Sequence, residues 1–403
     1  MDRRTFLTSG LIGCSAAASP LLTPITLASA PWEGRLVVII LRGALDGLDA
    51  VRPWGDPDFA AMREELTGRD PEPHAIGNFF GLHPALAPLA PLWQAGELAV
   101  AHAVSTPYRD KRSHFDGQAL LEAGNGGDPL NIARDGWLNR LLQIAPGVET
   151  RTAFAVGRDR LHVLAGEGAH ATWSPNTALN LSPQGTQLLE LIYHDDPLFR
   201  DAALQAMDII EGIETAETME GDPDMEEMGM MASPGGASGR VTGEVARFVV
   251  EQLRRDTRIA AFSINGWDTH AAQGRQIARK LDELAQTLLL MKAGLGAAWG
   301  HTAVLVMTEF GRTARVNGTK GTDHGTGGVM LAAGGAVRGG QAYGTWPGLA
   351  EADLYNGRDL MPVRDIRAYA GSAMRTLFGT SLSEIERTIF PGLEMGEDPR
   401  LLL

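Results

Sequence analysis

The sequence predicts an α/β fold in which a mainly parallel central sheet is covered by helices on both faces. Short apolar runs of strand length alternate with longer segments in which apolar residues recur every three or four positions. The runs are apolar along their whole length, which is typical of parallel strands buried on both faces. In such sheets ligands bind beyond the carboxyl ends of the strands, so the site is expected there.

The apolar runs define the expected strands, and the periodic segments between them define the expected helices. We expect strands at residues 35–41, 97–104, 151–156, 258–264, 302–308 and 328–335. We expect helices at residues 83–96, 114–124, 135–145, 243–256 and 271–298.

Composition and charge limit the class of protein. The 403 residues are 44% hydrophobic and 21% charged, which fits a single globular domain over residues 31–403. The net charge of −14 argues against nucleic acid or anionic lipid as the main partner. We expect no transmembrane segment, because no uninterrupted apolar stretch is long enough to span a bilayer.

Residues 1–30 have the pattern of a twin-arginine export signal. Arg3 and Arg4 precede a weakly apolar stretch that ends in small residues. Cleavage after Ala30 fits this ending, although Pro31 is unfavourable directly after a cleavage site. The pattern predicts a periplasmic or otherwise exported protein, and a short amphipathic helix is the alternative.

Cys14 is the only cysteine, so the mature protein is expected to form no internal disulfide. Residues 11–14 also resemble a lipoprotein box, and lipid anchoring at Cys14 is an alternative to release. Twin-arginine export carries folded proteins that often hold a metal or cofactor already.

Residues 211–240 form an acidic insertion with five methionines and a Pro-Gly-Ser end. This composition favours a lid or an excursion from the sheet over a domain boundary. Thioethers also bind Cu(I), so a copper site is the alternative to a solvated loop.

Carboxylates and imidazoles follow the expected strands. Their oxygen and nitrogen atoms form the ligand mixture of a divalent zinc, manganese or iron centre with one or two ions. The candidate metal ligands are Asp46, Asp268, His270, Glu309, Asp323 and His324. Each also has an ordinary interpretation as a helix cap, a turn residue or an ion-pair partner.

The segment 309–328 contains six glycines, which allow the chain to turn sharply between two strands. We expect this turn to bring Glu309 and His324 together on one metal. Arg312 and Arg315 lie in the same loop and are candidates for holding an anionic ester oxygen.

Ser113 lies where a helix is expected to begin after the second strand. A helix N-terminus favours an attacking oxyanion and an anionic substrate, so Ser113 is a candidate catalytic nucleophile. Ser113 and Asp116 also form a capping box, which needs no catalytic role. His114 is a candidate base, metal ligand or helix residue.

Several segments resemble one known family. "SHFDGQALLEAG", "GWDTHAAQGR" and "TEFGRTARVNGTKGTDHG" look like the characteristic segments of the family of domain of unknown function 1501, and the resemblance spans roughly residues 35–380. That family is placed with the alkaline phosphatase and sulfatase superfamily. The resemblance therefore implies an alkaline phosphatase/sulfatase-like fold with a metal site at the strand ends.

The resemblance also implies roles for individual residues. Asp46 matches the superfamily's first metal-binding acid, Asp268 and His270 resemble the next pair, and His324 resembles the late histidine. Glu309 stands where the superfamily usually has an Asp-His dipeptide. This departure weakens the resemblance to a site that holds a second metal ion.

The resemblance leaves two functions open. The first is an exported metal-dependent hydrolase of phosphate or sulfate esters, acting on an anionic small-molecule or polymer substrate. The second is a non-catalytic exported binding or assembly protein that retains the fold. In this family an exported protein partner encoded nearby is common, which favours the second function somewhat.

Overall fold

The computed structural model describes residues 32–68, 70–175 and 236–403. The predicted export signal, Cys14 and nearly all of the acidic insertion at 211–240 lie outside the described residues. Among the described residues, no helix is both long enough and apolar enough to cross a membrane.

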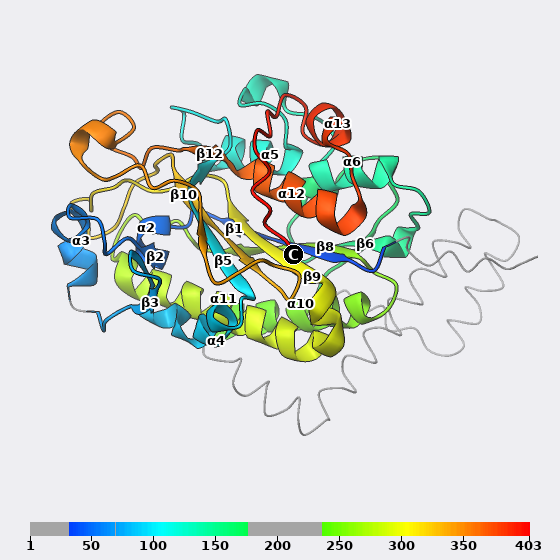
Figure 1. Ribbon diagram of the computed structural model, residues 1–403, viewed down its shortest axis with the longest axis horizontal. Helices are drawn as coiled ribbons and strands as arrows, with labels where there is room; N and C mark the ends of the chain where they lie inside the picture. Colours follow the sequence, from blue (N-terminus) through cyan, green and yellow to red (C-terminus); the bar gives the residue numbers. More distant parts are fainter. Residues whose placement is uncertain (1–31, 69, 176–235) are drawn as a thin grey trace, which may run out of the picture.

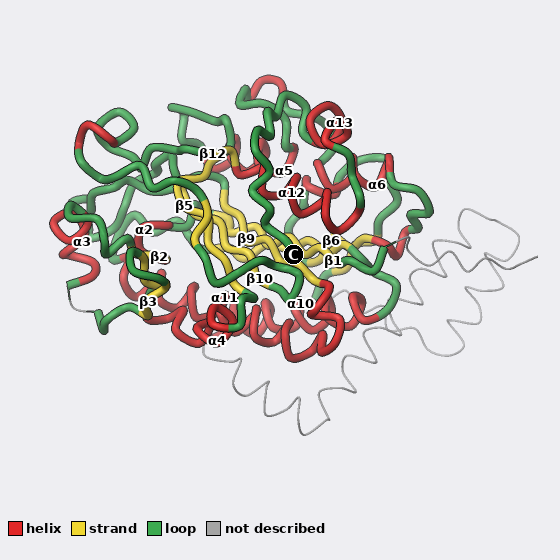
Figure 2. Tube along the Cα trace, in the orientation of Figure 1, coloured by secondary structure: helices red, strands yellow, loops and turns green. Residues whose placement is uncertain are grey.

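A mainly parallel sheet forms the centre of the fold, and Figure 2 shows its strands lying between helices. In the described part of the chain it has nine strands in the order β11-β5-β10-β9-β1-β8-β6-β7, with β12 also beside β5. The strands are β1 Arg35–Arg42, β5 Leu98–Ser105, β6 Ala153–Val156, β7 Ala171–Trp173, β8 Ile259–Asn265, β9 Thr302–Thr308, β10 Gly328–Ala333, β11 Ala342–Tyr343 and β12 Arg364–Asp365. Only β10 runs antiparallel to its neighbours, β5 and β9. The predicted α/β class is therefore confirmed.

The sheet is buried on both faces, as its continuous apolar strands require. In β1, Val37 and Ile39 belong to the core on one face, whereas Leu36 and Val38 belong to the core on the other. Figure 1 shows α4, α10 and α11 below the sheet, and α5, α6, α12 and α13 above it. The helices of these two layers are α4 Ala90–Gln94, α5 His114–Ala123, α6 Trp137–Ile144, α10 Gly236–Arg254, α11 Gln273–Leu295, α12 Ile366–Phe378 and α13 Leu382–Glu384.

Shorter elements fill the connections between these layers. At one end, β2 Val51–Arg52, β3 His74–Ile76 and β4 Phe80–Leu82 form an antiparallel sheet next to α2 Gly47–Ala50 and α3 Phe59–Thr67. The 3-10 helices are η2 Pro84–Leu89, η3 Pro129–Asn131, η4 Thr150–Thr152, η5 His162–Leu164, η6 Gly296–His301 and η7 Glu351–Asp353, and η8 Ile385–Ile389 is a π-helical turn.

The prediction of one helix over residues 83–96 was wrong. The segment forms the 3-10 helix η2 followed by the short helix α4. Pro88 lies inside η2 and Pro91 lies in the first turn of α4. Because proline has no backbone N–H and clashes with the preceding turn, a continuous α-helix cannot run through these positions.

The topology brings four chain segments to one edge of the sheet. Strands β1, β8 and β9 are parallel and in register, with Arg42 opposite Asn265 and Leu41 opposite Thr308, so their carboxyl ends coincide. Because β10 is antiparallel to both β9 and β5, its amino end and the carboxyl end of β5 lie at this same edge. The segments following β5, β8 and β9 and the segment preceding β10 therefore meet there.

Glycines allow the loop between β9 and β10 to fold back on itself. The Gly311 amide donates to the Thr326 carbonyl at 3.1 Å, and the Gly325 amide donates to the Gly311 carbonyl at 2.8 Å. A Cβ atom on Gly311 would lie 1.9 Å from the carbonyl oxygen of Gly327, closer than any real contact. The close approach of the two backbone segments therefore requires glycine at position 311.

We predict that Gly311→Ala lowers the free energy of unfolding by about 1–3 kcal/mol, because the two backbone segments must separate to admit the methyl group. Gly318→Ala is the matched control in the same loop, since a Cβ atom there would have no heavy atom within 4 Å. Urea denaturation measures both variants. Equal stability of the two variants would show that the predicted clash is relieved without cost.

Candidate metal centre

Asp268 lies at the centre of the polar groups at this edge. It follows β8 directly, and Trp267 anchors the turn by donating from its indole N–H to the Ile264 carbonyl at 2.9 Å. Trp267 is buried, whereas 44% of the Asp268 side chain is exposed. The carboxylate is thus held by a rigid turn and remains accessible to solvent.

Three imidazoles point their Nε2 atoms toward Asp268. The distances to Asp268 Oδ1 are 3.3 Å from His114, 3.1 Å from His270 and 3.5 Å from His324. The Nε2 atoms of His270 and His324 lie 2.9 Å apart. His114 begins α5, His270 follows β8 and His324 precedes β10, so three separate segments supply the three rings.

The Nδ1 atom of each imidazole faces a hydrogen-bond acceptor. The pairs are His114 with Glu309 Oε1 at 2.9 Å, His270 with Asp323 Oδ1 at 3.0 Å, and His324 with the Arg112 carbonyl at 2.6 Å. Carbonyl and ionised carboxylate oxygens only accept hydrogen bonds, so each Nδ1 carries the proton. In the neutral rings each Nε2 atom therefore carries a free lone pair. Metal-binding histidines adopt this arrangement.

The acids of the site are held in their ionised form. Burial alone would raise the pKa of Glu309, but hydrogen bonds from His114, Gln118 and the Gly43 amide outweigh burial and lower it. A hydrogen bond from Asn317 lowers the pKa of Asp323.

The same balance holds at Asp268. Burial would raise its pKa, but the hydrogen bond and charge of Arg312, together with the nearby imidazoles of His114 and His270, outweigh burial and lower it. All three carboxylates are therefore available as anions at neutral pH.

The imidazoles of His114 and His324 have pKa values that are shifted in opposite directions. The hydrogen bond from His114 to Glu309 raises the pKa of His114, whereas burial lowers the pKa of His324. The Nε2 atom of His114 is buried and makes no hydrogen bond, although Asp268 is near. This buried nitrogen faces a carboxylate and a second imidazole, so it is placed where it can bind a cation.

The dimensions and charges of this cluster fit a divalent metal ion. The ligand atoms of His114, Asp268 and His324 all lie within 4.8 Å of one another. Atoms bound roughly 2.0–2.2 Å from an ion lie roughly 3 Å apart, close to the distances from Asp268. Asp268, Glu309 and Asp323 bring three carboxylates to the site, and Arg312 pairs with Asp268. Two imidazoles and one carboxylate suit zinc, manganese or iron.

A second group, made of two acids and a histidine, is less suited to bind a metal ion. Asp49, Asp70 and His83 also bring their ligand atoms within 4.8 Å. Arg52 lies among them and forms ion pairs with both Asp49 and Asp70, so one guanidinium bridges the two acids of this group. The Nδ1 atom of His83 accepts from the Ala85 amide, which places the ring proton on Nε2, toward Asp70.

Asp46, one of the expected metal ligands, binds protein groups in this structure. Its carboxylate is buried and forms an ion pair with Arg63 at 2.6 Å. It also accepts from Gln273 at 2.8 Å and from the amides of Leu48 and Asp49, because Asp46 is the N-cap of α2. Both oxygens are thus occupied by protein donors.

Arg312 also has a different role from the expected one. Its guanidinium is buried and donates to Asp268 at 2.6 Å and to the backbone carbonyls of Ala44, Trp267 and Thr322 at 2.8, 3.1 and 3.0 Å. These acceptors leave no exposed edge for a substrate oxygen. In this structure Arg312 orients the Asp268 carboxylate instead of facing the solvent, where an ester anion would bind.

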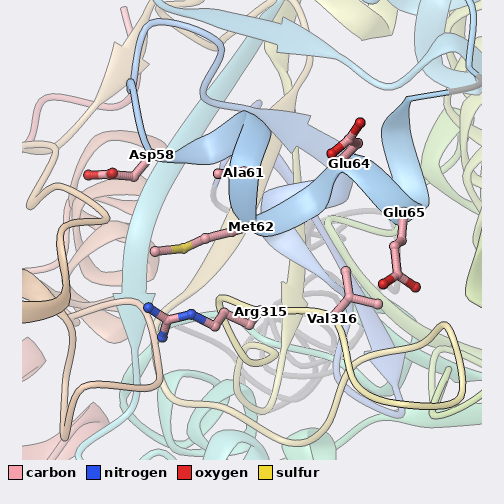
Figure 3. A pocket seen from close by; sticks show the side chains of 7 residues that line it. All are labelled: Asp58, Ala61, Met62, Glu64, Glu65, Arg315 and Val316. Atoms are coloured by element: carbon pink, nitrogen blue, oxygen red, sulfur yellow. The ribbon is translucent and has the colours of Figure 1, made fainter.

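Arg315 lies away from the three imidazoles. It lines a surface pocket beside α3 together with Asp58, Ala61, Met62, Glu64, Glu65 and Val316 (Figure 3). Its guanidinium is 3.7 Å from the Glu351 carboxylate. Because this pocket is lined by acids, it is unsuited to the anionic group that Arg315 was expected to hold.

Ser113 caps α5. Its hydroxyl accepts from the Asp116 amide at 3.4 Å, and its own amide donates to the Tyr108 hydroxyl at 2.9 Å. The capping interpretation of the sequence therefore describes the hydroxyl.

Two of the expected metal ligands, Glu309 and Asp323, lie behind the rings of His114 and His270. Their carboxylates contact the Nδ1 atoms and do not lie among the Nε2 atoms around Asp268.

Sequence reasoning missed the groups that support the site. Arg63, Gln118 and Gln273 hold carboxylates from other elements, and no local pattern predicts these distant contacts. Asn317 donates to Asp323 at 3.0 Å, and it was not among the expected site residues. The Arg112 carbonyl is a backbone group and leaves no trace in the sequence.

The comparison with protein families identifies one family. Residues 103–380, more than half of the chain, match the family described as protein of unknown function (DUF1501). The chain belongs to this family. The match includes His114, Asp268, His270, Glu309 and His324. None of the curated proteins matches this DUF1501 sequence.

Two solved structures are similar to this DUF1501 protein in fold. One is a protein in the alkaline phosphatase superfamily from Vibrio parahaemolyticus, with 13% identity, a TM-score of 0.35, and 83% of this chain and 69% of that chain covered. The other is Ps i-CgsB in complex with k-i-k-neocarrahexaose, with 11% identity, a TM-score of 0.39, and 87% and 73% covered. Likenesses of this degree carry no argument about the site.

We predict that Arg63→Met lowers the free energy of unfolding by about 3–5 kcal/mol, because it leaves the buried Asp46 charge without its partner. Chemical denaturation measures the loss. Adding Asp46→Asn to this variant removes the unpaired charge, so the double variant is expected to recover part of the stability. A double variant less stable than Arg63→Met would contradict the ion-pair account.

The effect of Arg63→Met is expected to depend on pH. Burial raises the pKa of Asp46, but Arg63 outweighs burial and the net pKa lies below its ordinary value. Asp46 thus stabilises the fold fully above its unfolded pKa of about 3.9, and this contribution is lost as pH falls through the lower folded pKa. The stability gap between wild type and variant should narrow in acid.

Proposed function

We propose that this DUF1501 protein is an exported metal-dependent hydrolase of phosphate or sulfate esters. The observation that carries the proposal is the convergence of the His114 and His324 Nε2 atoms on Asp268, with both Nδ1 atoms committed to acceptors. Three protein ligands with solvent access are typical of a catalytic metal site rather than a closed structural one. Export is supported by the twin-arginine pattern of residues 1–30.

In this proposal His114, Asp268 and His324 hold one divalent ion. When bound, such an ion supplies Lewis-acid chemistry, drawing electron density from an ester oxygen. Glu309 and the Arg112 carbonyl fix the orientation of the two rings, and Arg312 fixes Asp268. These three contacts are formed within the protein itself and do not depend on bound substrate.

His270 is the group proposed to move a proton. Its Nδ1–H is held by Asp323, and its Nε2 lone pair lies at the exposed side of the cluster, with 45% of the side chain accessible. Nε2 takes a proton from the attacking water as the water oxygen bonds to phosphorus or sulfur. The ester oxygen leaves with the bonding electron pair, and Nε2 returns the proton to it, so one water is added across the bond.

Water is the proposed nucleophile because the Ser113 hydroxyl is used as a helix cap. The amino end of α5 carries partial positive charge next to His114, which favours an anionic substrate there. The proposed substrate is therefore an anionic small-molecule or polymer ester, met in the periplasm or elsewhere outside the cytoplasm.

The same capping hydroxyl favours a second candidate function. A Ser113 hydroxyl that serves as a cap fits a non-catalytic exported binding or assembly protein, and such a protein would interact with another exported protein. Metal binding without turnover of either ester class would favour this second function.

We predict that the mature protein, expressed with its own leader, contains close to one transition-metal ion per chain by mass spectrometry. His114→Ala and His324→Ala should lose this ion. His270→Gln should keep it but lose hydrolysis of p-nitrophenyl phosphate or sulfate by roughly 100-fold or more, the usual contribution of a positioned acid–base group.

His83→Gln is the matched control, because His83 lies in the group of acids that Arg52 already neutralises. It should retain both the ion and the turnover. Loss of the ion in His83→Gln but not in His324→Ala would move the metal to the other group. Absence of metal in the wild type would contradict the proposed hydrolase.

We also predict that Glu309→Gln retains the ion but binds zinc about 10–100-fold more weakly, because Glu309 orients His114 instead of binding the metal. Zinc titration calorimetry on metal-free protein measures the affinity. A complete loss of binding, equal to that of His114→Ala, would show that Glu309 is itself a ligand.

A further inference from the structure

Asp359 is a buried acid that collects donors from three segments near the cluster. Its side chain is inaccessible to solvent. Oδ2 accepts from the Arg112 guanidinium at 3.1 Å and from the Thr326 hydroxyl at 2.8 Å, and Oδ1 accepts from the Arg358 guanidinium at 2.8 Å. Two guanidiniums therefore share one carboxylate.

Both of these arginines also contact His324. The Arg112 backbone carbonyl accepts from the Nδ1–H of His324 at 2.6 Å. The Arg358 guanidinium donates to the backbone carbonyl of His324 at 2.8 Å. The ring and the backbone of His324 are thus connected to Asp359 through two separate residues.

The segment that supplies the Arg112 carbonyl has an unfavourable backbone conformation. Arg112 has a φ of 50° and Asp110 a φ of 68°, both in the left-handed region that L-residues with a Cβ avoid. Such a conformation persists only when surrounding contacts hold it. The contacts here are the ion pair from Arg112 to Asp359 and a hydrogen bond from the Tyr355 hydroxyl to Asp110 at 3.1 Å.

We propose that Asp359 is a positioning residue for the metal centre. Its carboxylate accepts hydrogen bonds from both the Arg112 and the Arg358 guanidinium, and its negative charge offsets the repulsion between these two cations. In doing so it keeps the Arg112 carbonyl on the His324 ring, which holds the Nε2 lone pair of His324 toward Asp268. The consequence for metal binding rests on the proposed function, whereas the orientation of the ring does not.

The test follows the His324 ring in metal-free protein by NMR with ¹⁵N-labelled histidine. In the wild type we expect a slowly exchanging Nδ1–H signal, assigned by its absence in His324→Gln. Asp359→Asn should lose this signal or broaden it, because the Arg112 carbonyl is no longer held. An unchanged, slowly exchanging signal in folded Asp359→Asn would overturn the proposal.

Two further variants keep the test decisive. Asp398→Asn removes a carboxylate with similar partners, Ser372 and Arg375, and should leave the His324 signal intact. If Asp359→Asn fails to fold, Arg112→Gln breaks one connection at a half-buried position and should broaden the same signal. A sharp signal in Arg112→Gln would then overturn the proposal.

Zinc titration of the same proteins separates this inference from the proposed function. Asp359→Asn should bind zinc about 10–100-fold more weakly than wild type, as expected when a group supporting a metal ligand is lost. Wild-type affinity in the variant would count against the positioning role. A wild type that binds no zinc would contradict the proposed function, and the NMR result would still decide the role of Asp359.

Discussion

The site depends on one constraint: imidazole lone pairs converge on a single carboxylate oxygen and cannot turn away. Each Nδ1 atom is fixed by an acceptor, so the Nε2 atoms of His114, His270 and His324 face Asp268 together. The Arg312 guanidinium donates to this oxygen, and a divalent ion bound here would stabilise the lone pairs and the carboxylate together. The buried charges around the cluster, from Glu309 to Arg312 and Asp359, preserve this arrangement.

The sheet topology makes the constraint possible. Because β10 runs antiparallel to β9 and β5, the loop that carries Asp323 and His324 returns to the edge where β8 delivers Asp268 and β5 leads to His114. A fully parallel sheet would place the amino end of β10 at the opposite edge. Gly311 and Gly325 permit the return, since their backbones pack directly against each other.

The sequence predicted features that depend on local pattern. The central strands are continuous apolar runs, so their positions followed directly, and the S-x-x-D pattern at Ser113 predicted the cap that forms. The helix at 83–96 failed because Pro88 and Pro91 outweigh apolar periodicity. The roles of Asp46 and Arg312 depend on distant partners, Arg63 on α3 and the carbonyl of Trp267 after β8, and no local pattern predicts such contacts. His114 was a candidate, but its hydrogen bond to Glu309 depends on the close approach of α5 to the residues that follow β9.

Anomalous X-ray scattering from crystals grown with zinc would test the central claim most directly. Data collected on both sides of the zinc absorption edge locate the ion without reference to any assumed ligand. The account predicts one peak within bonding distance of His114 Nε2, His324 Nε2 and an Asp268 oxygen. A peak beside Asp46 or the Asp49, Asp70 and His83 group, or no ordered peak at the cluster, would contradict it.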